Sequence, residues 1–453
     1  MFRILIIAAL LLWTVWLIAV PPFVPKTTIA EDFATLGCVS CLDANAGLDV
    51  LHSQYHPGEF FSLRYYLNSP NVGNPDADAR AAYYEAILTP TVIFNGLQTV
   101  IGGGTEIADG STYLNIFRAK QFAPTPVKLN IQDFNTQSGA LSARVTIVAD
   151  DYSLTNQSVH FLLIENNVTT EATRVVRAVQ TQPITLSGLN NYQDFSLSFT
   201  IDPSYVTANL WAAAVVQLSD KTILQTDAYL VQPQYQIRAA MTWGQEIVGA
   251  TNFNFISEPV WFFNTGETEN FTIKLVKDDG PADWYLNFCD EDGLCYPGNI
   301  PLPFSLSAGS VTAYHLNLFV GSSGTAHFRF VIESDNIPDY EIPFSYQTDD
   351  TSNDDNVLPV SVLSIMQNYP NPFSGNTVFR INAKTASQPV QIDIYNTKGQ
   401  KVSSLVTSAL KAGQNEITWQ AAGPDGKTLP SGIYFAGLKD SSDTMTKLLL
   451  INK

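Results

Sequence analysis

The chain has 453 residues, too many for one hydrophobic core, so about three domains are expected. Hydrophobic residues make up 45% and charged residues 15% of the chain, which excludes wholesale disorder. The net charge of −18 repels phosphate backbones, and no Lys/Arg cluster is interleaved with aromatic residues, so the sequence argues against nucleic acid as a partner.

The charge is distributed unevenly along the chain. From Ser361 to the C-terminus there are 9 basic and 5 acidic residues, a net charge of +4. The part before Ser361 holds the other 15 basic and 37 acidic residues, a net charge of −22. The C-terminal stretch is therefore a different kind of module from the rest.

The N-terminus has the pattern of a secretory signal. Arg3 precedes an apolar run from Ile4 to Val20, a short basic start followed by an apolar core. The run also just reaches the length that spans a membrane, so an uncleaved anchor is the alternative. We assign residues 1–25 to a signal peptide or signal anchor, and either one takes the rest of the chain out of the cytoplasm.

Residues 26–123 mix strand-like and helix-like segments and are expected to form an α/β domain. Strands are predicted over 28–33, 60–67 and 91–94, and helices over 42–55, 76–87 and 111–121. Pro124-Thr125-Pro126 follows and is interpreted as a linker, because prolines punctuate the chain there.

Two all-β units are expected next. Over residues 124–233, and again over 234–347, short strand patterns alternate with turn residues, which is typical of antiparallel, immunoglobulin-like sandwiches. The stretch 348–360 is acidic, small and polar, the composition of a flexible linker. Residues 361–453 form the last predicted domain.

A Cys-x-x-Cys motif, Cys38-Val39-Ser40-Cys41, lies between a predicted strand and a predicted helix. A thiol at a helix N-terminus feels the positive end of the helix dipole, which lowers its pKa and favours the thiolate. Two cysteines three residues apart can share the first helical turn and close a small disulfide, Cys38–Cys41. Thr89-Pro90 occurs later in the sequence and leads into the strand 91–94.

With these motifs, residues 27–122 resemble a thioredoxin-fold domain of the secreted, Omp28-related kind. Further similarity lies in residues 74–84, 162–168 and 175–178. The resemblance implies that Cys38 is the attacking thiolate and Cys41 the resolving thiol. It also implies that Pro90, with Thr89, is a cis-proline that shapes the platform where a substrate segment lies.

Two departures from the thioredoxin pattern leave an alternative open. Leu36-Gly37 stands where a Trp usually precedes the first cysteine, and Val39-Ser40 is not a Gly-Pro pair. The alternative is a thioredoxin fold in which the Cys38–Cys41 bond is structural and the protein binds without catalysing.

A zinc site has to be weighed, because Cys38, Cys41, His52 and His56 have a spacing close to that of a Cys₂His₂ site. If the helix begins at Cys38, His52 lies fourteen residues further on, roughly 20 Å away at about 1.5 Å rise per residue. No tetrahedral site spans that distance. We therefore expect no metal and no cofactor.

Cys289 and Cys295 form the second close cysteine pair. The five residues between them have the length of a hairpin loop, and Asp292-Gly293 supplies the turn. Because an exported chain meets oxidising conditions, the sequence predicts a local Cys289–Cys295 disulfide.

The last module opens with Asn368-Tyr369-Pro370-Asn371-Pro372-Phe373, and six short strand patterns follow, which is typical of a small sandwich. This module resembles the type A C-terminal sorting domain of the type IX secretion system. Besides the opening motif, the resemblance rests on Gly399, Gly432 and Lys447. It implies recognition by the type IX secretion machinery and export across both membranes, to the cell surface or the extracellular space. The alternative is a sandwich retained for binding.

The sequence thus predicts a multidomain protein with an α/β thioredoxin-like domain, two all-β sandwich units and a C-terminal sorting domain. Its predicted function is thiol–disulfide exchange through Cys38 and Cys41 on protein thiol or disulfide substrates outside the cell. The alternative function is non-catalytic surface binding or adhesion.

Overall fold

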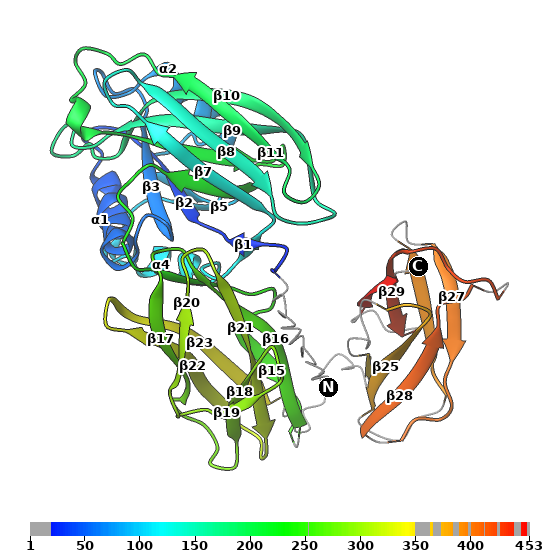
Figure 1. Ribbon diagram of the computed structural model, residues 1–453. Coiled ribbons are helices and arrows are strands. Elements are labelled where there is room, and N and C mark those ends of the chain that lie inside the picture. The colour runs from blue at the N-terminus through cyan, green and yellow to red at the C-terminus, as the bar shows by residue number, and fades with distance from the viewer. Residues whose placement is uncertain are drawn as a thin grey trace, which may run out of the picture. The chain divides into compact units, whose positions relative to one another are not determined.

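The computed structural model of the protein (Figure 1) describes residues 20–251, 253–348, 363–365, 373–383, 389–396, 400–411, 413–423, 426–438 and 445–450. The chain divides into two compact units, Met1–Asp350 and Thr351–Lys453. Residues 1–19 of the expected signal segment and residues 349–360 of the expected linker lie outside the described residues. Within the described part of the chain, no helix is both long and apolar enough to cross a membrane.

The first part of the larger unit is a mixed α/β region. Its elements are β1 (Val24–Pro25), β2 (Thr28–Ala34), α1 (Val39–Gln54), β3 (Phe60–Tyr66), α2 (Pro75–Tyr84), β4 (Thr91–Phe94), β5 (Gln98–Ile101), α3 (Thr105–Ala108) and α4 (Ser111–Arg118). Strands β2 and β3 are parallel, β4 is antiparallel to β2, and β5 is antiparallel to β4, which gives the order β3-β2-β4-β5.

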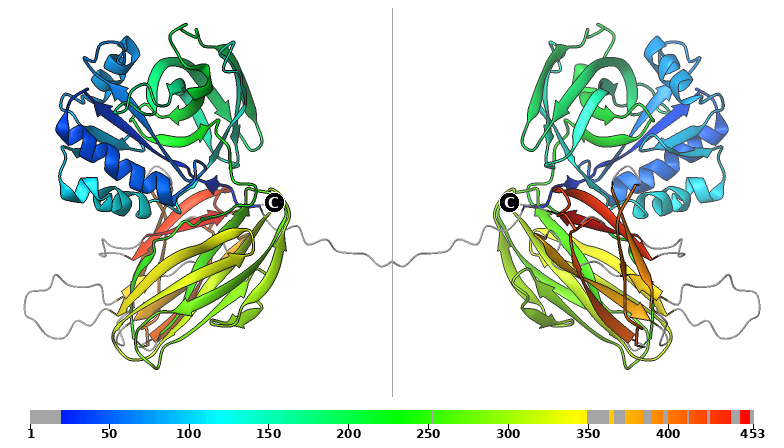
Figure 2. Two further views of the ribbon diagram at one scale, coloured as in Figure 1. Left: turned by 90° about the vertical axis from the view of Figure 1, so that its left-hand side faces the viewer. Right: turned by 90° about the vertical axis from the view of Figure 1, so that its right-hand side faces the viewer.

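Both faces of this sheet are covered by helices. Strand β2 is buried along its whole length, and its neighbouring residues Ile29 and Ala30 point into two different apolar clusters. One cluster holds α1, α3 and α4, which lie against one face of the sheet (Figure 2), and the other cluster holds α2. Gly47 permits the closest of these contacts, because a Cβ there would lie 1.9 Å from the carbonyl oxygen of Ile107.

The next segment is all-β and continues the same sheet. Its elements are β6 (Pro124–Thr125), β7 (Val127–Phe134), β8 (Ala140–Ile147), β9 (Ser153–Glu165), β10 (Val175–Ser187), β11 (Tyr192–Ser198), η1 (Thr207–Asn209), β12 (Leu210–Gln217) and β13 (Ile223–Ala228). Strand β10 runs parallel to β3, where Val175 pairs with Arg64, so the sheet has eight strands in the order β13-β12-β9-β10-β3-β2-β4-β5. A three-stranded sheet, β11-β8-β7, packs on β9, β10, β12 and their shared core.

Pro124-Thr125, which the sequence suggested as a linker, is instead the short strand β6. It pairs with β1, Val24 opposite Thr125, and Thr125 is buried. After α4, the chain therefore returns to lie beside β1, which precedes β2, and then continues into β7.

A further all-β segment consists of two five-stranded sheets around one core that is rich in aromatic side chains. Its strands are β14 (Ile237–Ala240), β15 (Glu246–Gly249), β16 (Phe253–Asn264), β17 (Glu269–Lys277), β18 (Tyr285–Asp290), β19 (Cys295–Pro297), β20 (Leu302–Leu306), β21 (Val311–Val320), β22 (Thr325–Ser334) and β23 (Ile337–Thr348). The sheet orders are β14-β16-β21-β18-β19 and β15-β23-β22-β17-β20. The buried Arg238 ties this segment to the α/β region by donating to the carbonyl oxygen of Lys26 and to Thr27 Oγ1.

The smaller unit, Thr351–Lys453, is a small sandwich. Its strands are β24 (Leu363–Ile365), β25 (Asn376–Ala383), β26 (Gln391–Asn396), β27 (Lys401–Val406), β28 (Gly413–Gln420), β29 (Gly432–Leu438) and β30 (Met445–Leu450). They form the sheets β24-β25-β28 and β27-β26-β29-β30, which enclose a core that includes Phe379, Ile394 and Trp419.

Candidate functional site

Cys38 and Cys41 are joined by a disulfide at the beginning of α1, with their Cα atoms 5.2 Å apart. Cys38 is the N-cap residue, and its Sγ accepts a hydrogen bond from the backbone N–H of Cys41 at 3.2 Å. After reduction, the same N–H and the helix dipole would stabilise a thiolate at Cys38. The local structure follows from the sequence, because Gly37 has a positive φ of 74° that turns the chain from β2 into the helix.

The two cysteines differ in exposure. Cys38 is half-buried, whereas Cys41 is only 6% exposed and packs in a small apolar cluster with Tyr66, Val72 and Ala172. The first cysteine of the motif is therefore partly open to solvent, whereas the second is enclosed.

Thr89 and Pro90 lie beside this disulfide. The peptide bond between them is cis, and Pro90 is buried. The carbonyl oxygen of Thr89 lies 3.8 Å from Cys38 Sγ, and the Thr35 hydroxyl donates to Thr89 Oγ1 at 3.1 Å. The structure thus brings together the four predicted site residues Cys38, Cys41, Thr89 and Pro90.

Large apolar side chains are exposed on the two segments that carry these residues. Val39 is 77% exposed, and Leu42, one turn further along α1, is also exposed. Ile87, 90% exposed, and Leu88 directly precede Thr89. Apolar side chains left in water on both segments of one site favour contact with another molecule.

A buried polar network lies under α1, and the sequence analysis missed it. Asp32 on β2 accepts from Arg64 Nε on β3 at 2.7 Å, and Arg64 Nη2 donates to Asn45 Oδ1 on α1 at 2.7 Å. Arg174 joins from the far end of the β9–β10 connection, donating to Asn45 and to Asp49. The sequence signal was present: Glu31-Asp32 are carboxylates inside an otherwise apolar strand, where they need buried partners.

Asp32 is the group in this network with an incomplete set of partners. It is fully buried, and its Oδ1 has no hydrogen-bond partner. Burial raises the pKa of Asp32, and the attraction of Arg64 offsets only part of that rise. Asn45 is one helical turn beyond Cys41, so this carboxyl group sits beneath the same face of α1 that carries the enclosed sulfur.

The second cysteine pair lies elsewhere in the fold. Cys289 on β18 and Cys295 on β19 are joined by a disulfide across a hairpin, with their Cα atoms 4.0 Å apart. Asp290 and Gly293 close the turn by a backbone hydrogen bond. The bond constrains a surface hairpin of the β14–β23 segment, and Cys295 is exposed.

The histidines weighed as zinc ligands are engaged in other contacts. His52 Nε2 lies 2.9 Å from Ser62 Oγ, and burial lowers the pKa of His52 to about 3. His56 lies beyond the other end of α1 from the cysteines. Across the residues that the structure describes, no group of three or more His, Cys, Asp or Glu side chains could hold a metal ion.

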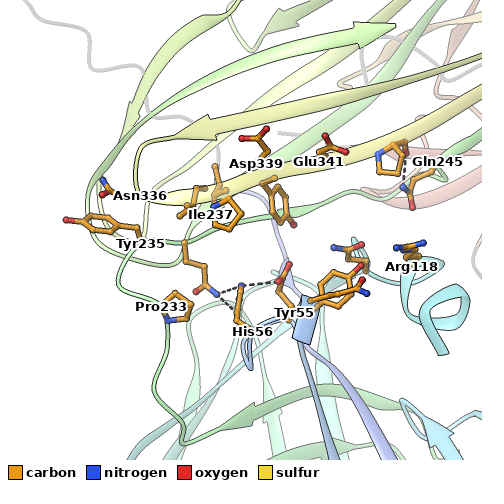
Figure 3. Close-up of a pocket in the computed structure, with 18 residues that line it drawn as sticks. Tyr55, His56, Arg118, Pro233, Tyr235, Ile237, Gln245, Asn336, Asp339 and Glu341 are labelled. Carbon is orange, nitrogen blue, oxygen red and sulfur yellow. Dashed lines mark hydrogen bonds and ion pairs between the residues drawn. The ribbon is translucent and has the colours of Figure 1, made fainter. Parts of the chain in front are cut away.

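A cavity of about 570 Å³ lies between the C-terminal end of α1 and the β14–β23 segment (Figure 3). Its floor includes His56, whose Nδ1 accepts from the Gly58 N–H and whose Nε2 lies 3.1 Å from Glu59 Oε2. Gln236 Nε2 lies 2.6 Å from the His56 ring, and Tyr55 and Tyr235 line the walls. Since α1 has 16 residues, this cavity is about 24 Å from the disulfide, at about 1.5 Å per residue.

The titratable groups of this cavity are perturbed by burial. Burial, and next the charge of Arg238, lower the pKa of His56 to about 3, so its ring is neutral at physiological pH. Burial raises the pKa of Glu59, although Arg238 opposes the rise. Enclosed groups of this kind in a cavity of ligand size mark a candidate binding site.

In the smaller unit, three of the predicted sorting residues are among the described residues. Phe373 is buried with its ring centroid 5.8 Å from that of Trp419, Gly432 begins β29, and Lys447 lies in β30 opposite Phe435. The other predicted sorting residues, Asn368, Tyr369, Pro370, Asn371, Pro372 and Gly399, lie outside the described residues.

These observations define a multidomain protein with a disulfide-bonded Cys-x-x-Cys in a mixed α/β region, β-rich sheets after it and a separate terminal sandwich. Residues 367–452 match the family described as secretion system C-terminal sorting domain. This match confirms the prediction of a type IX sorting domain, which interacts with the type IX secretion machinery. The protein is therefore exported across the outer membrane to the cell surface or the extracellular space, as predicted.

Comparison with curated proteins finds no match to this chain. Among solved structures, HBP35 of Porphyromonas gingivalis is similar over 71% of this chain and 98% of its own, with 10% identity and a TM-score of 0.37. Dimeric latent PorU from the same organism is similar over 73% of this chain, with 14% identity and a TM-score of 0.26. The chain spans about a third of PorU, 34% of its length.

Proposed function

We propose that the protein is an exported, thioredoxin-like thiol–disulfide exchange protein whose reacting group is the Cys38–Cys41 pair. The observation that carries the proposal is the placement of a half-exposed Cys38 at the N-cap of α1, with Thr89 and Pro90 beside it. The order β3-β2-β4-β5, with helices on both faces of the sheet, supports the thioredoxin-like assignment.

The chemistry is a pair of thiol–disulfide exchanges. A thiolate of a partner protein attacks Cys38 Sγ, the Cys38–Cys41 bond breaks, and Cys41 leaves as a thiolate that takes up a proton. A second partner thiolate then attacks the partner's sulfur in the mixed disulfide and releases Cys38 as a thiolate. The partner loses two electrons and gains a disulfide, while the Cys38–Cys41 pair is reduced; the reverse sequence reduces a partner disulfide.

The exposed side chains around the pair fit a protein substrate. A polypeptide segment laid beside Pro90 would cover Val39, Leu42 and Ile87, which otherwise remain in water. A protein thiol or disulfide, rather than a small thiol alone, is therefore the proposed substrate class.

The proposal is tested by trapping. In a Cys41→Ser variant, the Cys38 thiolate should attack a disulfide of intact insulin, release the other insulin sulfur as a thiolate and remain in a mixed disulfide with the insulin chain. The unaltered protein should accelerate insulin reduction by dithiothreitol. Cys38→Ser is the matched control and should do neither. The proposed exchange function would be contradicted if the unaltered protein did not accelerate insulin reduction and Cys41→Ser trapped no mixed disulfide.

The second candidate function, non-catalytic binding with a structural Cys38–Cys41 bond, has one observation in its favour. The cavity beside His56 and Glu59 is of ligand size and is separated from the disulfide by the length of α1. Under this alternative, reduction of Cys38–Cys41 would lower the stability of the α/β region and leave no trapped partner.

A further inference from the structure

The connection between β9 and β10, residues 166–174, belongs by sequence to the all-β segment but lies over the Cys-x-x-Cys motif. Ala172 is completely buried and shares an apolar cluster with Cys41 and Tyr66. Val168, from the same connection, packs against that cluster as a partly buried side chain. We call residues 166–174 the cover.

The cover is held on the α/β region by three hydrogen bonds to two elements, β3 and α1. The backbone N–H of Arg64 on β3 donates to the Arg174 carbonyl oxygen at 2.9 Å, and Tyr66 Oη donates to the Glu171 carbonyl oxygen at 2.8 Å. Arg174 Nη2 reaches α1, where it donates to Asp49 Oδ1 at 2.7 Å. These bonds hold the C-terminal half of the cover, Glu171 and Arg174, in place relative to Cys41.

Hydrogen bonds within the cover also hold it in a defined conformation. The Val168 N–H donates to the Ala172 carbonyl oxygen at 2.9 Å, and the Ala172 N–H donates to Thr169 Oγ1 at 3.0 Å. A segment with its own hydrogen bonds and three anchors opens only when several interactions break together.

We propose that the cover makes the all-β segment part of the exchange site, by enclosing the Cys41 sulfur and leaving Cys38 as the one sulfur of the pair that a partner can attack. This inference rests on the proposed exchange function and assigns Ala172, Val168 and Arg174 a positioning role in it. The apolar enclosure shields Cys41 from reagents in solution, while Cys38 at the helix N-terminus stays partly exposed, so the cover widens the difference in reactivity between the two thiols.

The test measures the alkylation of single thiols in the full chain, with the Cys289–Cys295 bond intact. In Cys38→Ser, Cys41 should react with iodoacetamide at least ~100-fold more slowly than Cys38 does in Cys41→Ser, because reaction waits for the cover to open. Adding Arg174→Gly, which removes the anchor on Asp49 at a position whose φ of +54° suits glycine, should raise the Cys41 rate by about tenfold or more.

Arg144→Ala, added to Cys38→Ser, is the matched control. Arg144 pairs with Asp194 at the same 2.7 Å, but on β8 and β11, so the Cys41 rate should not change. If Arg174→Gly does not fold, as judged by circular dichroism, Val168→Ser provides the second opening variant. Cys41 reacting as fast as Cys38, or a Cys41 rate that neither Arg174→Gly nor Val168→Ser changes, would overturn the proposal.

This experiment separates the two claims. Alkylation of Cys41 needs no exchange partner, so the role of the cover can hold even if insulin reduction fails. If insulin is reduced but Cys41 is freely alkylated, the exchange function stands and the inference about the cover falls.

Discussion

Replacing Arg80 by methionine should strongly destabilise the α/β region. Arg80 on α2 binds the Glu31 carboxylate with two nitrogens, Nε at 2.7 Å and Nη2 at 2.9 Å. Tyr84 and Tyr65 donate their hydroxyls to the same carboxylate, at 2.6 and 2.9 Å. The Glu31 side chain is 1% exposed and that of Arg80 is 7% exposed, so the carboxylate cannot turn to water when its cation is lost.

The magnitude follows from the burial. Removing one partner of a buried ion pair typically costs about 3–5 kcal/mol, because the remaining charge stays uncompensated. With a urea m-value of about 3 kcal/mol/M, the unfolding midpoint should fall by about 1–1.7 M. Arg144→Ala, which breaks the exposed Arg144–Asp194 pair, should cost less than about 1 kcal/mol.

The loss of stability caused by Arg80→Met should also depend on pH. Burial alone would raise the pKa of Glu31, but Arg80 and the two tyrosine hydroxyls hold it below its usual value. That contribution to stability is present above the unfolded pKa and is lost as the pH falls through the folded pKa. In Arg80→Met, burial raises the pKa of Glu31 in the folded protein above its value in the unfolded chain, so this variant gains stability as the pH falls. The difference in unfolding free energy between Arg80→Met and the unaltered protein therefore becomes smaller at low pH.

The assay is urea unfolding at pH 7 and pH 5, followed by hydrogen exchange of peptides from β2 and β3. The unaltered protein and Arg144→Ala are measured beside Arg80→Met. A loss no larger than that of Arg144→Ala, or a loss that does not shrink at pH 5, would refute the reasoning.

Three further outcomes are expected. Cys289→Ser should lower stability by about 2 kcal/mol in urea unfolding, because the bond closes only a short loop; a loss above about 5 kcal/mol would contradict this. Burial raises the pKa of Asp227, which accepts the Ile131 N–H, to about 6. The protonated carboxyl therefore contributes about 3 kcal/mol to the free energy of unfolding at low pH, and this contribution is lost as the pH rises from about 4 through 6. Asp227→Asn should flatten this fall in stability when unfolding is measured against pH. Deleting residues 361–453 should leave the folded protein in the periplasm in cell fractionation, and normal surface delivery would contradict it.

The α/β region was largely predictable because its signals are local. The strand 91–94 has the bounds of β4, and the strand 28–33 falls one residue short of β2. The helix expected over 76–87 ends earlier, at Tyr84, because Glu85 adopts a left-handed φ of 61°. That early end places Ile87 and Leu88 in the loop that leads to Pro90.

Two long strands of the all-β segments each contain a proline. Strand β10 holds Pro183 and β16 holds Pro259, which sits at a break in the pairing register with β21. Proline inside an apolar run argues against a strand, since it cannot donate to the ladder. In β10 and β16 the pairing of neighbouring residues outweighs that local signal.

The site itself could be predicted only in part. Cys38, Cys41 and Thr89-Pro90 form motifs that are visible in the sequence, but the Asp32–Arg64 pair depends on the parallel register of β2 and β3. The cover depends on β10 lying beside β3, a pairing between segments far apart in the chain. Contacts of this kind are set by tertiary packing, for which a single sequence carries no local pattern.

The reduction potential of the Cys38–Cys41 pair tests the central claim most directly. It is measured by equilibrating the full chain with glutathione buffers and counting labelled thiols by mass spectrometry, with Cys289–Cys295 as the structural reference in the same molecule. Exchange chemistry predicts a potential at or above about −270 mV for Cys38–Cys41, since the helix N-terminus stabilises the reduced form. A potential below about −300 mV, like that of structural disulfides, would contradict the account.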